Sequence, residues 1–471
     1  GFEFVNGFHD TANAVATVIY THSLPPNVAV VWSGLWNLIG VLVSSGAVAY
    51  GIVALLPIDL VMNVGSASGF AMVFALLISA IVWNLGTWYL GLPASSSHTM
   101  IGSILGVGLA NSMLAGHGFS EGVNWGKAKE VGISLFVSPV IGFVFSALLL
   151  FLLKALIRNP KLFTPPEKDK APPGWIRGIL VLTCTGVSYF HGSNDGQKGM
   201  GLIVLILVGV LPGTYALKLN ESHDKVHAIA VQAASIADIF AKKAPDPSLD
   251  EKAAIAELES FVKSDGVLRA RTFEAVAAAC RLINQKLQNI NSFSDLSDQE
   301  RRSVRNDIYG VASALEKMDK AGVLTDPAEK KAADAFSADL DSVTKYIPAW
   351  VKIAVACALG LGTMVGWKRI VVTVGEKIGK SHLTYGQGAA AELVAAATIK
   401  IFDNLGLPVS TTHVLSSGVA GTMAANGSGL QAQTLRNILL AWVLTLPVCI
   451  FLGSMLFAFG NFLVFHVLGL H

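Results

Sequence analysis

The sequence predicts an all-α polytopic membrane protein, built from two inverted-topology repeats with broken helices or helical hairpins and carrying a soluble helical insert. Three observations predict this fold class. Hydrophobic residues make up 52% of the chain and charged residues only 14%, whereas charged residues are about a quarter of an ordinary soluble domain. Apolar stretches of about twenty residues, long enough to cross a bilayer, follow one another along most of the chain. Polar motifs of the first half also recur in the second.

The first five apolar stretches predict membrane spans. They are residues 1–21, 28–56, 70–90, a stretch that begins after Pro93, and 131–157. The next stretch, residues 179–217, is nearly twice the length of one span, so it is either two spans or one helix broken at a polar octet. Because the first stretch is already under way at Phe2 and Gly1 is not a Met, we expect no cleavable signal peptide and an incomplete first helix.

Changes of composition divide the chain into five segments. They are a first membrane repeat (1–158), a linker (159–177), the start of a second repeat (178–217), a soluble helical insert (218–346) and the remainder of the second repeat (347–471). The linker is basic and rich in proline, which predicts a cytoplasmic position. A second basic cluster, residues 368–380, predicts the same side, so the repeats would be inverted and the insert periplasmic. The insert has helical periodicity and nearly balanced charge, as is typical of a solvated bundle.

The charge and the cysteines argue against other classes of protein. Lys and Arg number 34 against 32 Asp and Glu, and the net charge of +2 gives no sign of a nucleic-acid partner. The four cysteines have no metal-site or redox spacing. No cofactor and no structural metal are therefore predicted.

An eight-residue motif establishes the internal duplication. Gly91–His98 reads GLPASSSH and Gly406–His413 reads GLPVSTTH, with five identities in eight positions. Pro139 and Pro447 also fall at matching places in the two closing spans. Landmarks repeated in the same order indicate duplicated halves. Duplicated halves in a membrane protein are typical of secondary transporters, which bind their substrate near the midplane between the repeats.

Two further octets carry a carboxylate inside apolar sequence. Gly7–Ala14 reads GFHDTANA and Gly192–Gly199 reads GSNDGQKG, with Asp10 and Asp195 at the same place. An ionised Asp facing lipid costs on the order of 3 kcal/mol, so both must point inward. One such Asp would most simply be a cap or an interhelical hydrogen bond, but two at equivalent positions favour a functional pair.

The neighbours of these carboxylates could complete a site for ions. His9 and Asn13 share a helical face with Asp10, and Lys198 shares one with Asp195. Asn194 lies beside the second carboxylate. Such faces offer carboxylate and amide oxygens to a cation or proton and an ammonium group to an anion.

The repeated GLP motifs predict an anion site. Pro93 and Pro408 indicate helix starts, because proline is favoured in the first turn. The hydroxyl runs would then lie at helix N-termini, where free N–H groups and the helix dipole bind oxyanions. The alternative is ordinary N-terminal capping by serine and threonine. The hydroxyl residues are Ser95, Ser96, Ser97, Ser410, Thr411 and Thr412.

Three more ionisable residues lie in apolar sequence. His98 and His413 follow the hydroxyl runs and would either relay protons or be ordinary core histidines. Glu392 has no clear acidic partner in the first half of the chain, and Lys400 and Asp403 are expected to cap the end of its segment.

Together these motifs resemble the inorganic phosphate transporter (Pit) family, and they look closest to its bacterial, low-affinity, proton-coupled members. The resemblance is carried by Phe8–Ala14, by His191–Gly199 and by the paired GLP motifs, and it covers nearly the whole membrane portion. It implies phosphate import by alternating access, in symport with protons, across the bacterial inner membrane. It further implies that phosphate travels as a neutral complex with a divalent metal (Mg, Ca or Zn), and that the protein is a lipid-embedded homodimer.

The residues can be assigned to roles on this basis. The phosphate site would comprise Ser95, Ser96, Ser97, Ser410, Thr411, Thr412, Asn13 and Lys198. The co-ion or proton would bind His9, Asp10, Asn194, Asp195 and Glu392. A proton relay would use His98 and His413. The sodium-coupled branch of the family has asparagine where this chain has His9 and Lys198, and this difference favours protons over sodium.

Alternatives from the same and from different classes remain. The chain could be a sodium-coupled phosphate symporter or a carrier of another oxyanion, such as sulfate or arsenate. An intramembrane hydrolase is disfavoured because the polar motifs are duplicated and no Gly-x-Ser-x-Gly elbow is present. A receptor or scaffold organised around the insert is the remaining class.

Overall fold

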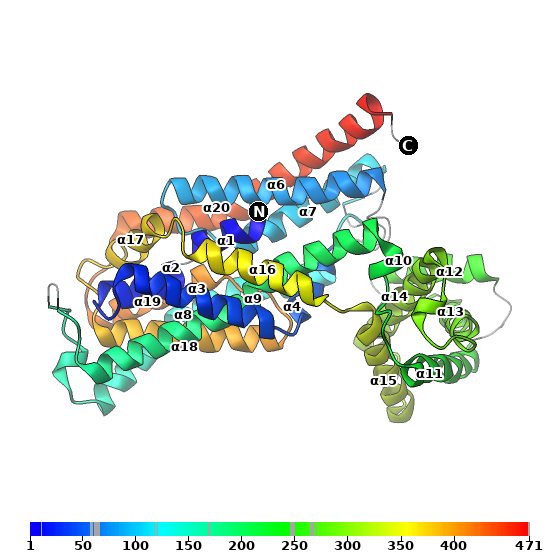
Figure 1. Ribbon diagram of the computed structural model, residues 1–471, viewed down its shortest axis with the longest axis horizontal. Helices are drawn as coiled ribbons and strands as arrows, with labels where there is room; N and C mark the ends of the chain where they lie inside the picture. Colours follow the sequence, from blue (N-terminus) through cyan, green and yellow to red (C-terminus); the bar gives the residue numbers. More distant parts are fainter. Residues whose placement is uncertain are drawn as a thin grey trace. The chain divides into compact units, whose positions relative to one another are not determined.

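The computed structural model describes most of the chain as helices joined by turns (Figure 1). The described residues are 1–10, 12–56, 60, 66–116, 118–119, 121–167, 170–244, 250–263, 268–269 and 271–469. They fall into two compact units. The first comprises Gly1–Leu56, Phe70–Ile203 and Pro348–His471, and the second comprises Pro57–Gly69 and Val204–Ile347.

The second unit is a group of amphipathic helices around an apolar core. Its longer helices are α11 (His223–Ala241), α12 (Glu251–Lys263), α13 (Thr272–Leu287), α14 (Asp298–Lys320) and α15 (Pro327–Thr344). Phe240, Phe293 and Phe336 are fully buried in the core. Ser297 and Glu300 form a capping box that starts α14, because each side chain satisfies a backbone N–H that the first turn leaves free.

The apolar helices lie wholly or mostly in the first unit. In chain order these are α1 (Phe2–Asp10), α2 (Ala12–Tyr20), α3 (Pro26–Val43), α4 (Ala47–Val53), α6 (Ala67–Tyr89), α7 (Ser96–Leu114), α8 (Trp125–Leu156), α9 (Gly174–Val210), α16 (Ala349–Thr363), α17 (Lys368–Glu376), α18 (Tyr385–Asn404), α19 (Thr411–Asn426) and α20 (Ala432–Phe462). Of the described helices, four are long and apolar enough to cross a bilayer: Pro26–Val43, Ala67–Tyr89, Trp125–Leu156 and Ala432–Val467.

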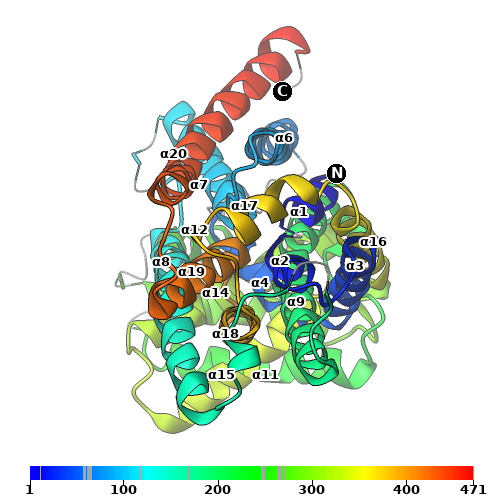
Figure 2. The same cartoon turned by 90° about the vertical axis from the view of Figure 1, so that its left-hand side faces the viewer.

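Helices from the two halves of the sequence pack reciprocally in this unit. α7 packs along α20, and α19 packs along α8, as Figures 1 and 2 also show. Glycines make both contacts close. A Cβ on Gly106 of α7 would lie 2.1 Å from the carbonyl oxygen of Ile450, and one on Gly421 of α19 would lie 2.1 Å from that of Phe143. Small residues at such positions let backbones touch, which is how helices associate in membranes.

Two predictions about helix continuity were wrong. Residues 28–56 were expected to form one span, but α3 ends at Val43 and α4 begins at Ala47 after Gly46, whose φ of 91° suits glycine. The segment 179–217 was expected to be two spans or a broken helix, but α9 runs unbroken through the octet. The octet glycines serve close packing instead, since a Cβ on Gly192 would lie 2.1 Å from Asn37 O.

The prolines also differ from the prediction. Pro93 and Pro408 were expected in the first helical turn, but the N-caps are Ser95 and Ser410, two residues further on. The hydroxyl runs nevertheless start α7 and α19, as predicted. Helices therefore begin at the serines, whose side chains accept a backbone N–H that a proline could not satisfy.

Candidate functional site

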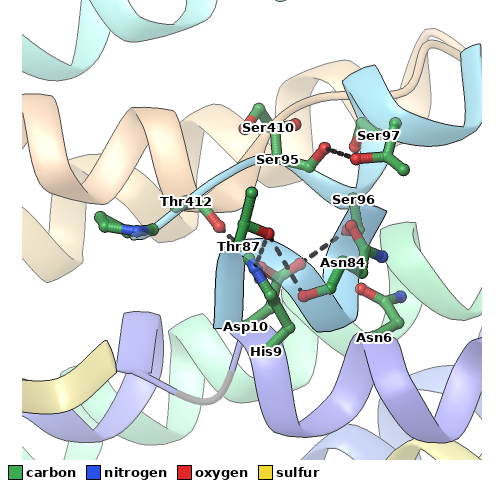
Figure 3. Close-up of polar contacts among 12 residues, drawn as sticks. Asn6, His9, Asp10, Asn84, Thr87, Ser95, Ser96, Ser97, Ser410 and Thr412 are labelled. Atoms are coloured by element: carbon green, nitrogen blue, oxygen red, sulfur yellow. Dashed lines mark hydrogen bonds and ion pairs between the residues drawn. The ribbon is translucent and has the colours of Figure 1, made fainter. Parts of the chain in front are cut away.

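The carboxylate of Asp10 is the point where the two halves meet. Asp10 is the last residue of α1. Ser96 Oγ, in the first turn of α7, donates to its Oδ2 at 2.7 Å. Thr412 Oγ1, in the first turn of α19, donates to its Oδ1 at 2.7 Å. Figure 3 shows both hydroxyls directed at Asp10. One hydroxyl run from each half therefore binds the same carboxylate, and all three residues are buried.

The remaining hydroxyls have structural partners. Ser95 and Ser410 cap their helices by accepting from the backbone N of His98 and His413, each at 3.2 Å. Ser97 Oγ donates to Val409 O at 2.8 Å and so ties the first GLP segment to the second. Thr411 is buried at the start of α19. The capping alternative thus applies to the first residue of each run, whereas Ser97 and Thr412 make contacts between the halves.

Asp195 lies beside Asp10 in the interior. Ser96 Oγ is 3.4 Å from Asp195 Oδ2, so one hydroxyl lies between the two carboxylates. Lys198 forms an ion pair with the same oxygen at 2.6 Å, and its side chain is fully buried. A buried ammonium group is stable only beside a charge of opposite sign. The pairing of Asp195 with Lys198 therefore neutralises one of the two carboxylates.

His191 belongs to the cluster although it was not assigned a role from the sequence. Its Nδ1 is 2.6 Å from Asn37 Oδ1. Its Nε2 lies 3.8 Å from Asp10 Oδ2 and 3.6 Å from Asp195 Oδ2 and has no hydrogen-bond partner among the described residues. Ligand atoms of the three side chains lie within 4.8 Å of one another. Two carboxylates and an imidazole suit a divalent cation. The i,i+4 spacing of His191 and Asp195 was the available signal.

His9 holds the other side of Asp10. Its Nδ1 is 3.2 Å from Asp10 Oδ1, and its Nε2 is 3.1 Å from Thr87 Oγ1 on α6. Thr87 Oγ1 donates to Trp83 O at 3.0 Å, so its oxygen accepts from His9. This series of hydrogen bonds holds the imidazole of His9 against the carboxylate of Asp10. The side chain of Asn13, which was assigned to the phosphate site, lies outside the described residues.

Glu3 and Asn6 extend the polar face of α1 toward Lys198. Asn6 Nδ2 donates to Glu3 Oε2 at 3.2 Å. A Cβ on Gly199, the residue after Lys198, would lie 2.4 Å from Glu3 Oε1, so the carboxyl group packs on the α9 backbone. Both residues are buried. Neither residue was predicted from the sequence, although Asn6 is four residues and Glu3 seven residues before Asp10, on the same helical face.

Asn194 joins α9 to the second GLP segment. Its Nδ2 donates to Leu407 O at 3.2 Å, and its Oδ1 accepts from Val409 N at 3.3 Å. The whole amide group is therefore bound to backbone just before α19. In this structure Asn194 positions the hydroxyl run. Binding of a co-ion by Asn194 stays a prediction.

The prediction that Asp403 caps the end of its segment was wrong. Asp403 is buried, and it accepts from Ser193 Oγ and from Gln197 Nε2, each at 2.8 Å. It thus satisfies two polar groups of the α9 octet. A continuous polar helix needs such partners in an apolar interior, because each unpaired buried group costs about 1–3 kcal/mol.

Glu392 and the two histidines have contacts other than hydrogen bonds to the central carboxylates. Glu392 is fully buried and accepts from the hydroxyls of Thr17 and Thr183. The rings of His98 and His413 are 4.5 Å apart, and His413 stacks on Trp442 at 3.9 Å. Among the described residues, no hydrogen bond joins these histidines to Asp10 or Asp195. The structure does not bring these three residues into the Asp10 cluster.

A double-mutant cycle tests the ion pair. Lys198→Met should destabilise the protein by about 3–5 kcal/mol, because it leaves Asp195 as an unpaired buried charge. Adding Asp195→Asn should restore part of this loss, since it removes the unpaired charge. The measurement is thermal unfolding in detergent. A double variant no more stable than Lys198→Met alone would contradict the pairing.

Membrane-length helices around a buried, charged cluster define a multi-pass membrane transporter. The family model described as "Phosphate transporter family" matches residues 6–453, and this chain belongs to that family. Members of the family are transporters, so the predictions of the Pit family and of a non-enzyme are confirmed.

Curated relatives match over nearly their whole length. The "Low-affinity inorganic phosphate transporter PitA" of Escherichia coli strain K12 is 42% identical over 97% of this chain and 94% of that protein. PitB of the same strain is 41% identical over 97% and 94%. The low-affinity inorganic phosphate transporter of Buchnera aphidicola (Acyrthosiphon pisum, strain APS) is 41% identical over 98% and 95%.

One solved structure has a similar fold. It is titled "The sodium-dependent phosphate transporter" and is 20% identical to this chain. The TM-score is 0.52, with 98% of this chain and 96% of that chain covered. At this identity the similarity bears on the fold alone, and it supports an all-helical fold.

Proposed function

We propose that this protein imports inorganic phosphate in symport with protons by alternating access. One observation carries the proposal: Ser96 and Thr412, at the N-termini of α7 and α19, both bind Asp10. Two helix N-termini that converge form an anion site. The choice of phosphate as the anion rests on relatives that are 41–42% identical and are named low-affinity inorganic phosphate transporters.

The carboxylates supply the coupling. A phosphate anion at the two N-termini would lie close to Asp10 and Asp195. Two like charges about 4 Å apart repel by about 4 kcal/mol at an effective dielectric constant of about 20. Among the described residues, only Asp195 of the two carboxylates has a lysine partner. Phosphate can therefore bind tightly only when a proton or a cation binds with it. A carrier with this requirement transports the two together, which is symport.

A divalent metal could enter with the phosphate as part of the substrate. Asp10, His191 and Asp195 offer two carboxylates and an imidazole within 4.8 Å. The metal would bind these side chains, and the phosphate oxygens would accept from the hydroxyl runs. The transported complex would then be neutral, which lowers the cost of crossing the membrane interior.

The reciprocal packing of the two halves supports inverted repeats. α7 of the first half packs on α20 of the second, and α19 packs on α8. If the repeats are inverted, rocking of one half against the other would expose the same site to each side in turn. We further propose that the protein lies in a bacterial inner membrane as a homodimer, with the 218–346 insert as a soluble helical domain.

Sodium is the second candidate co-ion, because the solved structure with a similar fold is titled a sodium-dependent transporter. Lys198 argues against sodium here. Its ammonium group lies 2.6 Å from Asp195 and has no acceptor atom, so it gives sodium no oxygen ligand where the sodium-coupled branch has an asparagine.

Uptake by proteoliposomes tests the function. Purified protein should accumulate labelled phosphate when the outside is made acidic, and should do so without sodium. Uptake that requires a sodium gradient and ignores the pH gradient would overturn proton symport. Unlabelled sulfate and arsenate, added in turn, test the anion, and stronger competition by sulfate than by phosphate would overturn the substrate.

His191→Ala should raise the magnesium concentration needed for half-maximal phosphate uptake. Loss of a metal ligand, or of the group that orients it by a hydrogen bond, typically lowers metal affinity about tenfold to a hundredfold. The measurement is uptake against magnesium concentration at fixed pH. His382→Ala, at an exposed position, is the matched control. An unchanged magnesium dependence in His191→Ala would contradict the metal–phosphate substrate.

A further inference from the structure

A cavity with basic side chains in its wall is lined by residues other than those of the Asp10 cluster. It has a volume of about 780 Å³ and lies between α6, α17 and α20 of the first unit. Three of its lining side chains are basic: Lys368, Arg369 and Lys377. No Asp or Glu is among the described residues that line it. The cavity therefore carries three positive charges without compensation and attracts anions.

Arg369 is held in place by aromatic rings. Its guanidinium carbon lies 5.1 Å from the ring centroid of Trp88 and 4.9 Å from that of Tyr89. Its Nη1 also donates to Tyr89 O at 2.6 Å. A guanidinium has five N–H donors, so others remain for a ligand. Such a fixed fork binds the oxygens of a phosphate group with little loss of entropy.

The walls of the cavity are also tied together. Trp88 Nε1 donates to Gly366 O at 2.8 Å, and Thr373 Oγ1 donates to Gly91 O at 2.8 Å. These bonds join α6 to α17 and to the turn before it. Lys368 and Lys377 are exposed and form no ion pair among the described residues. Two free ammonium groups thus stand beside a rigid, aromatic-lined wall.

The position of the cavity points to lipid as the source of the phosphate group. α6 and α20 are both long and apolar enough to span a bilayer. At the mouth of the cavity, Tyr89 is 65% exposed and Leu90 is 69% exposed. Tyrosine and tryptophan gather at the level of lipid headgroups, and basic pockets between spans at that level hold anionic headgroups. We propose that this cavity binds the phosphate group of an anionic phospholipid of the phosphatidylglycerol class.

The cavity adjoins the site without sharing its residues. Gly91 and Leu92 line it and directly precede Pro93 and the N-cap of α7. The proposal depends on the membrane location of the protein and not on which anion it transports. Failure of phosphate uptake in liposomes would therefore leave the lipid site standing.

Native mass spectrometry can count the lipids that the protein retains. Full-length protein is released from nanodiscs containing phosphatidylglycerol or only phosphatidylcholine. Arg369→Gln and Lys377→Gln should each reduce retained phosphatidylglycerol about fivefold, the effect of one basic residue near an anionic surface. Arg158→Gln is the matched control, since Arg158 is exposed and directly precedes the basic linker. Lys377→Gln is included because it breaks no hydrogen bond within the described structure.

The outcomes are distinct. Selective retention of phosphatidylglycerol by the unaltered protein and Arg158→Gln, with loss in both cavity variants, supports the proposal. Equal retention by all proteins overturns it. A separate arm titrates lipid-free protein with inorganic phosphate. Phosphate binding that Arg369→Gln removes, without any preference for phosphatidylglycerol, would overturn the lipid as the source and assign the cavity to free phosphate.

Discussion

Asp10→Asn is expected to reduce phosphate uptake by about two orders of magnitude. Asparagine has the shape of aspartate, so the helices should stay in place. One carboxylate oxygen becomes an amide NH2 group, however, and a hydrogen bond from Ser96 or Thr412 to a charged acceptor is lost. Such a bond contributes about 1.5–3 kcal/mol, and the negative charge that draws the proton or metal disappears with it.

The measurement is initial uptake rate in proteoliposomes at equal protein content. Asp238→Asn makes the same chemical change at an exposed position of α11 and should leave the rate unchanged. Asp195→Asn should reduce uptake as well, because the second carboxylate shares the hydroxyl of Ser96. Normal uptake by the Asp10→Asn, Asp195→Asn double variant would contradict the proposed roles of both residues.

The second large effect is expected at the glycines between the two halves. Gly106→Ala places a Cβ 2.1 Å from Ile450 O, and Gly421→Ala places one 2.1 Å from Phe143 O. Overpacking typically costs about 1–3 kcal/mol, and here the obstacle is backbone, which cannot rotate away. Each variant should therefore lower the midpoint of thermal unfolding in detergent.

Gly132→Ala in α8 is the matched control, because nothing lies within 4 Å of its Cβ. It should unfold at the same temperature as the unaltered protein or at a slightly higher one, since alanine has a higher helix propensity than glycine. The effects at Gly106 and Gly421 should be similar in size, because the two contacts are reciprocal. A large effect at one and none at the other would count against equivalent halves.

The sequence by itself determined that a small set of charged and hydroxyl-rich motifs lies within apolar segments. The octets of Asp10 and Asp195 and the paired GLP motifs stood out because charge and hydroxyl groups in an apolar chain are costly unless they have partners. Their duplication made a transporter the expected class, and the family comparison agrees. Ser95 and Ser410 could likewise be predicted at helix starts, because capping depends only on neighbouring residues.

Tertiary structure decided how these groups are paired. No local rule indicates that Asp10 binds Ser96 and Thr412, residues 86 and 402 positions away. The continuity of α9 was missed for the same reason. Its polar octet stays helical because Asp403, from α18, satisfies Ser193 and Gln197. Sequence patterns report the cost of burying a polar group, whereas the partner that offsets this cost is fixed only when distant helices pack together.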